Sequence, residues 1–390
     1  MTFRKQLQWG GLLIIVVSLL LSISNIIVYA GKHNAAIQAV YGVGYTGLIL
    51  ACTIIHIVQS RRAGLFGLFA YLVSVLCLVY VNVATFLTLA DLAGIEGTEQ
   101  ALTAVWSPMI PAVYAIFVGL ILLGLAVAYA GVLPRSSGIL MALGMGLQLP
   151  AQFAIDLAGP MFFIFTIGGS VIFGIGLIWI GWTLWSNKEL LDEDPRLSNL
   201  DRMWGSPLVM FSALLLIADA WLNSIANLTL FDSIIHLLSI ATLILAIVIL
   251  YTAQADRAGT MGLAGFFFLH LGATLNFIPA YFIMAQLAGQ LDSNQALMAS
   301  WIDIPVGRYG SYMLFLGILL FGVASIRAEV FPRWSGWLIV IGLGLLLPSQ
   351  FQSQAYLFST FWIIGATLLG VGIGWMGWIL FRNRDTQQAA

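Results

Sequence analysis

The chain has 390 residues, of which 61% are hydrophobic and only 8% are charged, and its formal net charge is −1. An ordinary soluble domain carries about a quarter charged residues, so this composition excludes a soluble globular protein and predicts an integral membrane protein. The near-neutral charge also excludes nucleic-acid binding through overall basicity.

Hydropathy predicts twelve helical spans, because a helix needs about twenty mostly apolar residues to cross the hydrocarbon core of a bilayer. Open strands are excluded there, since lipid offers no partners to unpaired backbone groups. The expected fold class is therefore all-α, a polytopic membrane bundle. In chain order, the predicted spans are 9–29, 37–58, 64–91, 107–131, 136–158, 161–185, 205–226, 232–252, 259–288, 306–328, 335–356 and 359–381.

The basic residues predict which span ends are cytoplasmic. With the N-terminus inside, thirteen Lys and Arg residues fall in cytoplasmic segments, and only Lys32 and Arg308 fall outside. This distribution agrees with the excess of positive charge in cytoplasmic loops. The polar segment 186–203 is then a cytoplasmic linker between two membrane domains, 1–185 and 204–390, and both termini are cytoplasmic.

The two predicted domains carry an internal repeat. Corresponding residues lie 195 positions apart at first, then 198 apart and finally 196 apart, because short insertions and deletions separate the copies. A duplicated unit determines the architecture, and an even number of spans in each copy predicts two parallel six-helix repeats. The corresponding segments include Trp9-Gly10 with Trp204-Gly205, Arg62-Ala63-Gly64 with Arg257-Ala258-Gly259, and Pro134-Arg135 with Pro332-Arg333.

Small residues recur along the last predicted span of each copy. Glycines at such positions let neighbouring helices approach closely, so we expect tight helix packing there. A sliding surface between moving bundles is the alternative. The glycines are Gly169, Gly174, Gly176 and Gly181 in the first copy and Gly365, Gly370, Gly372 and Gly377 in the second.

A proline followed by polar residues interrupts the fifth predicted span of each copy. Proline removes a backbone hydrogen bond, and helices broken at matching places in two repeats are a pointer to a transporter site. The polar residues two and six positions after the proline share one helical face. The alternative is that the kinks are architectural and that the amides join helices. The candidate binding residues are Gln152 and Asp156 after Pro150, and Gln350 and Gln354 after Pro348, with Gln148 and Gln352 on neighbouring faces.

Two further candidates are intramembrane charged residues. Asp219 lies about two-thirds of the way across the seventh predicted span, where its repeat counterpart is Ser24. It is expected to bind a proton, to pair with a cation or to line water, and an ordinary ion pair is the plainest of these interpretations. Arg308, at the outer start of the tenth span, is a candidate partner for Asp156, Asp219 or Asp303.

Metal and haem sites have little support in the sequence. The histidines, His33, His56, His236 and His270, have no metal-site spacing, and Tyr41 is the counterpart of His236. Metal centres need several convergent ligands. We therefore expect no metal and no cofactor, and we expect the two cysteines to be packed thiols.

The turn Gly131-Val132-Leu133-Pro134-Arg135-Ser136-Ser137-Gly138 and its counterpart Val330-Phe331-Pro332-Arg333-Trp334-Ser335-Gly336 resemble the G-x-L-P-R-x-x-G turn of an uncharacterised bacterial family of six-helix membrane proteins. The resemblance implies a tandem duplication in a bacterial plasma membrane but no activity. In plan, with two parallel six-span halves and a charged central loop, the chain also resembles the major facilitator superfamily. Fold alone does not imply function.

Three functions stay open. The first is a transporter or ligand-binding bundle for a small, weakly polar molecule, with a site between the two repeats. The second is a non-catalytic structural or accessory subunit, which would have protein partners in a membrane complex. The third is an intramembrane enzyme acting on lipid or quinone, for which the sequence offers no nucleophile and base. The expected partners are thus the lipid bilayer, a small molecule or a membrane complex, and no nucleic acid.

Overall fold

A computed structural model describes residues 3–29, 34–92, 98–153, 164–186, 199–225, 229–287, 308–347 and 355–388. These described residues form helices and short turns and contain no strand. Nine helical segments among them are long and apolar enough to cross a membrane. The prediction of an all-α integral membrane protein is therefore confirmed. The chain divides into two compact units, Arg4–Pro195 and Arg196–Ala390.

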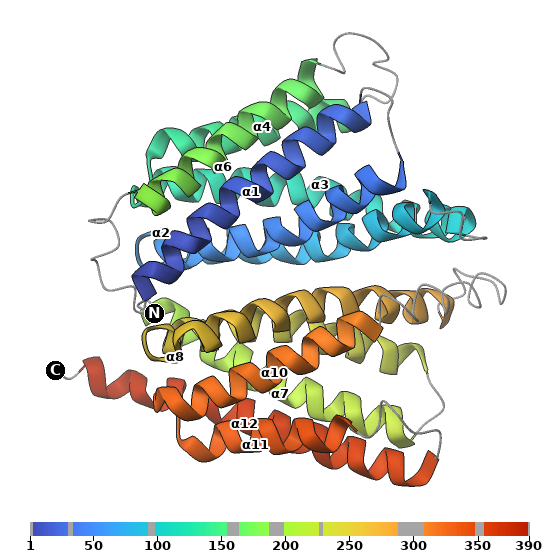
Figure 1. Cartoon of the computed structure of the whole chain (residues 1–390), viewed down its shortest axis with the longest axis vertical. Helices are drawn as coiled ribbons and strands as arrows, with labels where there is room; N and C mark the ends of the chain where they lie inside the picture. Colours follow the sequence, from blue (N-terminus) through green and yellow to red (C-terminus); the bar gives the residue numbers. More distant parts are fainter. Residues whose placement is uncertain are drawn as a thin grey trace. The chain divides into compact units, whose positions relative to one another are not determined.

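The first unit contains five α-helices and one short π-helix (Figure 1). Apolar runs of the expected length account for each helix, since a helix satisfies all its backbone groups within lipid. In chain order the elements are α1 (Phe3–Tyr29), α2 (Ala35–Leu92), α3 (Thr98–Ala130), α4 (Arg135–Phe153), η1 (Ile164–Gly168) and α6 (Gly169–Ser186).

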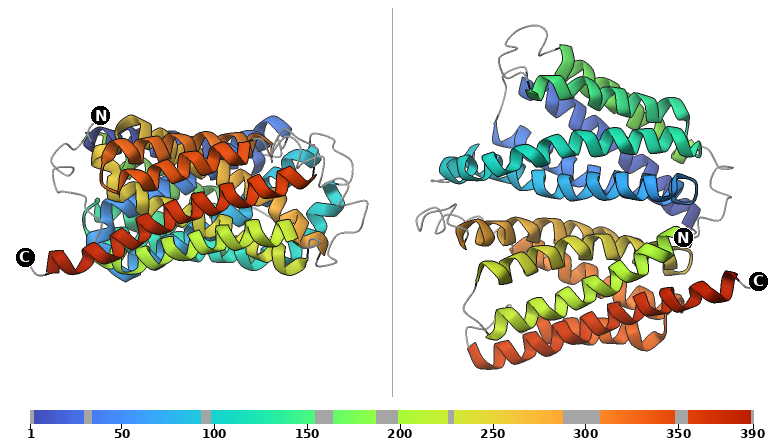
Figure 2. Two further views of the ribbon diagram at one scale, coloured as in Figure 1. Left: turned by 90° about the horizontal axis from the view of Figure 1, so that it is seen from below. Right: turned by 180° about the vertical axis from the view of Figure 1, so that it is seen from behind.

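The long helix α2 is a hairpin of two arms that reverses at one residue. Gly64 has φ +58° and ψ −147°, a backbone conformation that residues with a Cβ rarely adopt. Across the reversal, the Tyr71 ring stacks on the His56 ring with 4.5 Å between centroids, and the Asn82 amide donates to the Thr46 hydroxyl at 2.9 Å. Figure 2 shows the two arms side by side from behind. The predicted spans 37–58 and 64–91 correspond to these arms.

The helices of the first unit pack in chain order, and α6 closes the ring against α1. At each contact a glycine lies so near its neighbour that an added Cβ would approach a neighbouring atom to within 3.0 Å. The expected tight packing of Gly169 and Gly181 is confirmed. From α1 onward around the ring, the contacts are Val17 with Gly47, Ser74 with Gly119, Gly124 with Gly138, Gly144 with Gly169, and Gly181 with Gly11.

The second unit contains α7 (Asn199–Ile225), α8 (Leu230–Leu287), α10 (Arg308–Ala328), α11 (Arg333–Leu346) and α12 (Ala355–Gln388). Helix α8 reverses at Gly259, with φ +61° and ψ −156°, so it too is a hairpin. The Tyr251 ring stacks on Phe266 across this reversal, with centroids 4.6 Å apart. Gly259 is the repeat counterpart of Gly64.

Glycine contacts in the second unit follow the same order of helices. They join α7 to α8, the second arm of α8 to α10, α10 to α11, α11 to α12, and α12 back to α7. In that order the contacts are Gly205 with Ile249, Gly317 with Leu269, Gly322 with Gly336, Gly342 with Gly365, and Gly370 with Ala213.

The nine membrane-length segments are fewer than the twelve predicted spans for two reasons. The segment Leu230–Asn276 counts once, although α8 reverses at Gly259 within it. Helices α4 and α11 are not among the nine; predicted spans 136–158 and 335–356 extend past the described ends of these helices, at residues 153 and 347.

Candidate functional site

The structure describes the side chain of only one of the six residues predicted to bind a ligand. Asp219 lies on α7 with its side chain described. Gln152 belongs to α4 and Arg308 begins α10, but only their backbones are described. Asp156, Gln350 and Gln354 lie outside the described residues. The predicted grouping of these residues between the repeats therefore stays a prediction.

A cavity of about 340 Å³ lies inside the first unit. It is lined by α1, both arms of α2, α3, α4 and α6, so every α-helix of this unit contributes to its wall. On α1 the lining residues lie in the late part of the helix, and on the first arm of α2 they lie in the early part. The cavity thus occupies the half of the bundle away from the reversal at Gly64. Six of its polar side chains are those of Asn25, Gln38, Tyr41, Tyr45, Gln148 and Ser170.

Buried apolar side chains fill much of the other half of the first unit, together with buried polar ones such as His56 and Gln59. Large side chains from five helical segments interdigitate there without exposure to solvent, as close packing of a core requires. In the first unit, close packing thus lies toward Gly64 and the cavity lies toward the opposite end. The fully buried apolar side chains of the half toward Gly64 include those of Ile14, Ile55, Leu123, Met141, Leu177 and Ile180.

Hydrogen bonds hold the polar wall of the cavity in place. The Gln38 amide donates to the carbonyl of Thr85 at 3.0 Å, which joins the two arms of α2. The Ser18 hydroxyl donates to the carbonyl of Gly174 at 2.9 Å, which joins α1 to α6. Because each bond joins two elements of the ring, the wall is positioned by the packing of the unit.

Two pairs of polar side chains present hydrogen-bonding groups at the cavity. The Tyr41 and Tyr45 hydroxyls lie 3.0 Å apart, and their mutual bond uses one of the two hydroxyl hydrogens. The Ser170 hydroxyl donates to Oε1 of Gln148 at 3.3 Å. Hydroxyl and amide groups both donate and accept, so they suit a ligand with polar groups of either kind.

The described part of the cavity wall is uncharged. Among the described residues that line it, there is no Asp, Glu, Lys, Arg or His. Apolar side chains such as Phe117 and Phe173 complete the wall. Burying an unpaired charge in such surroundings is costly, whereas an uncharged molecule with a few polar groups is matched by these partners. The volume lies at the lower end of the range of about 300–1,000 Å³ usual for small-molecule pockets.

Sequence reasoning missed most of this wall. It named Gln148 only as an addition to the candidate Gln152; Gln148 lines the cavity, whereas the side chain of Gln152 lies outside the described ones. The signal that could have found the wall is the spacing of weakly polar residues on one helical face. Gln38, Tyr41 and Tyr45 have that spacing at the start of α2.

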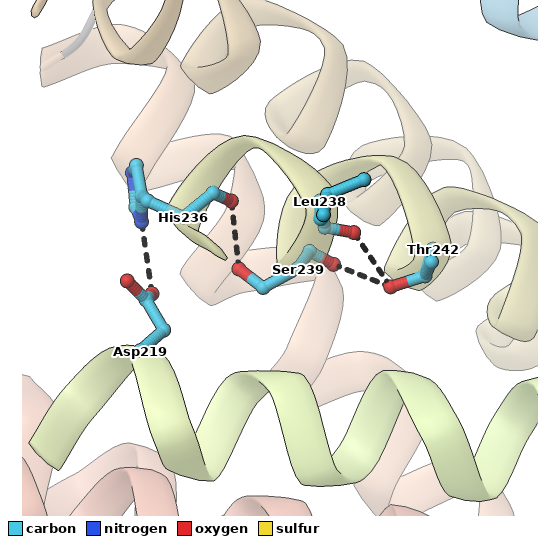
Figure 3. Close-up of polar contacts among 5 residues, drawn as sticks. All are labelled: Asp219, His236, Leu238, Ser239 and Thr242. Carbon is cyan, nitrogen blue, oxygen red and sulfur yellow. Dashed lines mark hydrogen bonds and ion pairs between the residues drawn. The ribbon is translucent and has the colours of Figure 1, made fainter. Parts of the chain in front are cut away.

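The second unit holds an ionisable pair that joins α7 to α8. Nδ1 of His236 lies 2.8 Å from a carboxylate oxygen of Asp219, and Figure 3 shows the Asp219 side chain reaching from α7 to the His236 ring. The Asp219 side chain is 8% exposed and the His236 side chain 36%. Of the interpretations open for Asp219, pairing has a described partner, and that partner is a histidine.

This pair differs from a catalytic triad. The nearby Ser239 hydroxyl donates to the backbone carbonyl of His236 at 2.8 Å and not to its ring (Figure 3). A nucleophile needs contact with the ring nitrogen of its base. The described residues also contain no group of three or more His, Cys, Asp or Glu that could hold a metal ion.

The same positions in the first unit are neutral. Asp219 and His236 are the repeat counterparts of Ser24 and Tyr41. The Ser24 hydroxyl donates to the carbonyl of Leu20 in its own helix, and Tyr41 bonds to Tyr45 in its own helix. These two bonds lie within single helices, whereas the Asp219–His236 bond crosses between two.

Comparisons with known proteins give no assignment. No family model matches the chain, no curated protein is significantly similar to it in sequence, and no solved structure matches it.

Proposed function

We propose that this integral membrane protein binds a small, uncharged, weakly polar molecule in the cavity of its first unit. The cavity carries the proposal, because it combines a ligand-sized volume with hydroxyl and amide groups and an apolar wall. Such sites between the helices of a bundle are a common place for small molecules to bind.

We further propose twelve spans in two six-helix repeats that arose by tandem duplication. Support comes from the matched reversals at Gly64 and Gly259 and from the glycine contacts that recur at corresponding positions in both units. From the distribution of basic residues we propose that both termini are cytoplasmic, and from the resemblance of the turns we propose a bacterial plasma membrane. In this orientation the cavity lies in the outer half of the first unit.

Binding within one unit is the part of the transporter hypothesis that the geometry supports. Transport across the membrane would require the packed inner half of this unit to open, or a second route between the repeats through residues such as Gln350 and Gln354. The packed half contains fully buried Leu123, Met141 and Leu177. No observation on the described residues favours the accessory-subunit or enzyme hypothesis over ligand binding.

A thermal-shift screen of the purified full-length protein tests the proposal. We expect uncharged metabolites, lipids or quinones that fit the cavity to raise the unfolding temperature, since a ligand at 100 times its Kd adds about 2.7 kcal/mol. Ala84→Phe, which fills the cavity wall at a buried position, should abolish the shift. Leu125→Phe, at an exposed position of α3, is the matched control and should keep it.

A milder variant separates loss of binding from misfolding. Tyr45→Phe keeps the ring but removes one hydroxyl of the cavity, and a lost hydrogen bond of about 1 kcal/mol weakens affinity roughly fivefold. The proposal fails if no uncharged compound stabilises the wild type. It also fails if every stabilising compound acts equally on wild type, Ala84→Phe and Tyr45→Phe.

A further inference from the structure

A mostly buried carboxylate lies within the apolar second unit, at a position where the fold does not require one. Asp219 is 8% exposed on its side chain and is bonded to His236 across two helices. Ionisable groups within membrane spans are costly, and they usually have a functional role. The first unit keeps the same helix order with Ser24 and Tyr41 at these positions. Helix packing alone therefore does not explain the pair.

The contact itself contains a proton. At 2.8 Å, Nδ1 of His236 and the carboxylate oxygen of Asp219 need one hydrogen between them, either as Nδ1–H donating to the carboxylate or as a carboxyl donating to the ring nitrogen. The other ring nitrogen, Nε2, is then the position at which a second proton adds. With one proton the pair carries a net negative charge, and with two it is an imidazolium–carboxylate pair without net charge.

The two members of the pair differ in how far the unit covers them. The His236 side chain is 36% exposed, and histidine is the side chain whose ordinary titration falls nearest physiological pH. The carboxylate behind it is held by the packing of α7, whose Trp221 indole donates to Thr367 on α12 at 3.3 Å. The histidine is therefore the accessible member and the carboxylate the buried one.

The described helices of the second unit carry other titratable side chains. On α8 these include Tyr251 and His270, which are buried. On α8, Asp232 lies one turn before His236 and accepts hydrogen bonds from the backbone and hydroxyl of Thr229. On α10, Tyr309 and Tyr312 are exposed near the start of the helix. On α12, the described side chains between residues 360 and 381 include no charged residue and no histidine.

We propose that Asp219 and His236 form a proton-binding site in the second unit. A proton from solvent adds to Nε2 of His236, and the Asp219 carboxylate holds the resulting imidazolium through the Nδ1–H bond. No bond to carbon forms or breaks, and the only ligand is the proton. The site goes beyond the ligand proposed for the first unit and does not depend on it.

Nitrogen NMR of the full-length protein in lipid nanodiscs, with ¹⁵N-labelled histidine, tests this site. The His236 signals are assigned by their loss in His236→Gln. We expect the two ring nitrogens of His236 to change reversibly from neutral to imidazolium values as the pH falls, within the range in which the protein stays folded. Wild type should take up one proton more than His236→Gln over that range.

Asp219→Asn and Ser239→Ala distinguish a proton site from a structural contact. Asp219→Asn should lose the Nδ1–H signature of a carboxylate acceptor and should alter the His236 transition, because the ring then donates to a neutral amide. Ser239→Ala removes only the bond to the His236 carbonyl and should leave the transition unchanged. The proposal is overturned if wild-type His236 keeps one protonation state over the whole range, or if Asp219→Asn titrates like wild type. No ligand of the first unit enters the measurement, so the two proposals fail separately.

Discussion

The late part of α1 and the early part of α2 differ from the corresponding parts of α7 and α8 in how their polar groups are bonded. In the first unit, Ser24 bonds within its own helix, Tyr41 bonds within its own helix, and a cavity lies alongside. In the second unit, Asp219 and His236 join the two helices through an ionisable bond. Elsewhere the glycine contacts are alike, with Gly124 and Gly144 matching Gly322 and Gly342. In this region they differ, because Gly44 and Gly47 pack on α1 where α8 has Ser239 and Thr242. The comparison teaches that two units with the same order of helix contacts can differ in the chemistry of one region.

The largest expected loss of stability tests whether the glycine contacts of the two units are equivalent. A Cβ at Gly144 would lie 2.3 Å from the backbone nitrogen of Phe173, and one at Gly342 would lie 2.6 Å from the carbonyl oxygen of Gly365. Backbone atoms cannot yield as a flexible side chain can. We expect Gly144→Ala and Gly342→Ala each to lower the free energy of unfolding by about 1–3 kcal/mol, measured by SDS titration in mixed micelles.

The matched controls lie one half-turn away on the same helices. Gly146 and Gly344 have no atom within 4 Å of an added Cβ, so alanine there should be neutral or should stabilise by up to about 1 kcal/mol through helix propensity. Equal losses of unfolding free energy at Gly144 and Gly146 would show that close contact does not cause the loss. A loss in one unit only would show that the glycine contacts of the two units are not equivalent.

A smaller effect is expected from exchanging the diverged residues. His236→Leu leaves the buried carboxylate of Asp219 without its ring partner. Breaking a fully buried pair costs about 3–5 kcal/mol, and the partial exposure of His236 reduces the expected loss of unfolding free energy to about 1–2 kcal/mol.

The double variant Asp219→Ser with His236→Tyr installs the residues of the first unit. We expect it to unfold within about 1 kcal/mol of wild type, because it removes both partners of the pair together. Chemical denaturation of the two single variants and the double variant gives the coupling energy. Additive losses would show that the pair does not act as a unit.

The smallest expected change in unfolding free energy concerns the turns before α4 and α11. Gly131 has φ +62°, and its counterpart Glu329 has φ +53°, which costs a residue with a Cβ about 1 kcal/mol. We expect Gly131→Ala to lower the unfolding free energy by about that amount and Glu329→Gly to recover a similar amount. Thermal unfolding at neutral pH measures both.

Glu329 adds a pH dependence that the first unit lacks at this turn. Its carboxylate bonds to Arg333, and this contact lowers the pKa of Glu329 below its ordinary value. Stability from the pair is present above the unfolded pKa and is lost as pH falls through the lowered folded pKa. Glu329→Gln should remove this acid-side loss. A Glu329→Gln variant with the wild-type pH profile would contradict the assignment.

Much of the fold could be predicted because it depends on local signals. Apolar length predicted the spans, and the paired glycines predicted close contacts; α2 and α8 also reverse at residues that the repeat had matched, Gly64 and Gly259. Hydropathy did not indicate, however, that the chain turns back at a single residue. It therefore predicted two separate helices joined by a loop where the structure has the hairpins α2 and α8.

The candidate site was predicted less well, because it depends on which helices are neighbours. Asp219 and His236 were both recognised as places where the copies differ. The sequence of each helix, however, does not indicate how far its side chains lie from those of another helix. The cavity was missed for a similar reason. Its polar residues are weakly polar hydroxyls and amides, such as Tyr45 and Ser170, which individually resemble ordinary contacts between membrane helices.

Packing in chain order has a consequence for synthesis. In each unit every helix meets the helix made just before it, and only the last contact, α6 with α1 or α12 with α7, joins distant parts of the chain. Local contacts form quickly, and domains emerging from the ribosome fold as units. The first bundle can therefore assemble hairpin by hairpin, and its described helices are all present once α6 enters the bilayer, before α7 does.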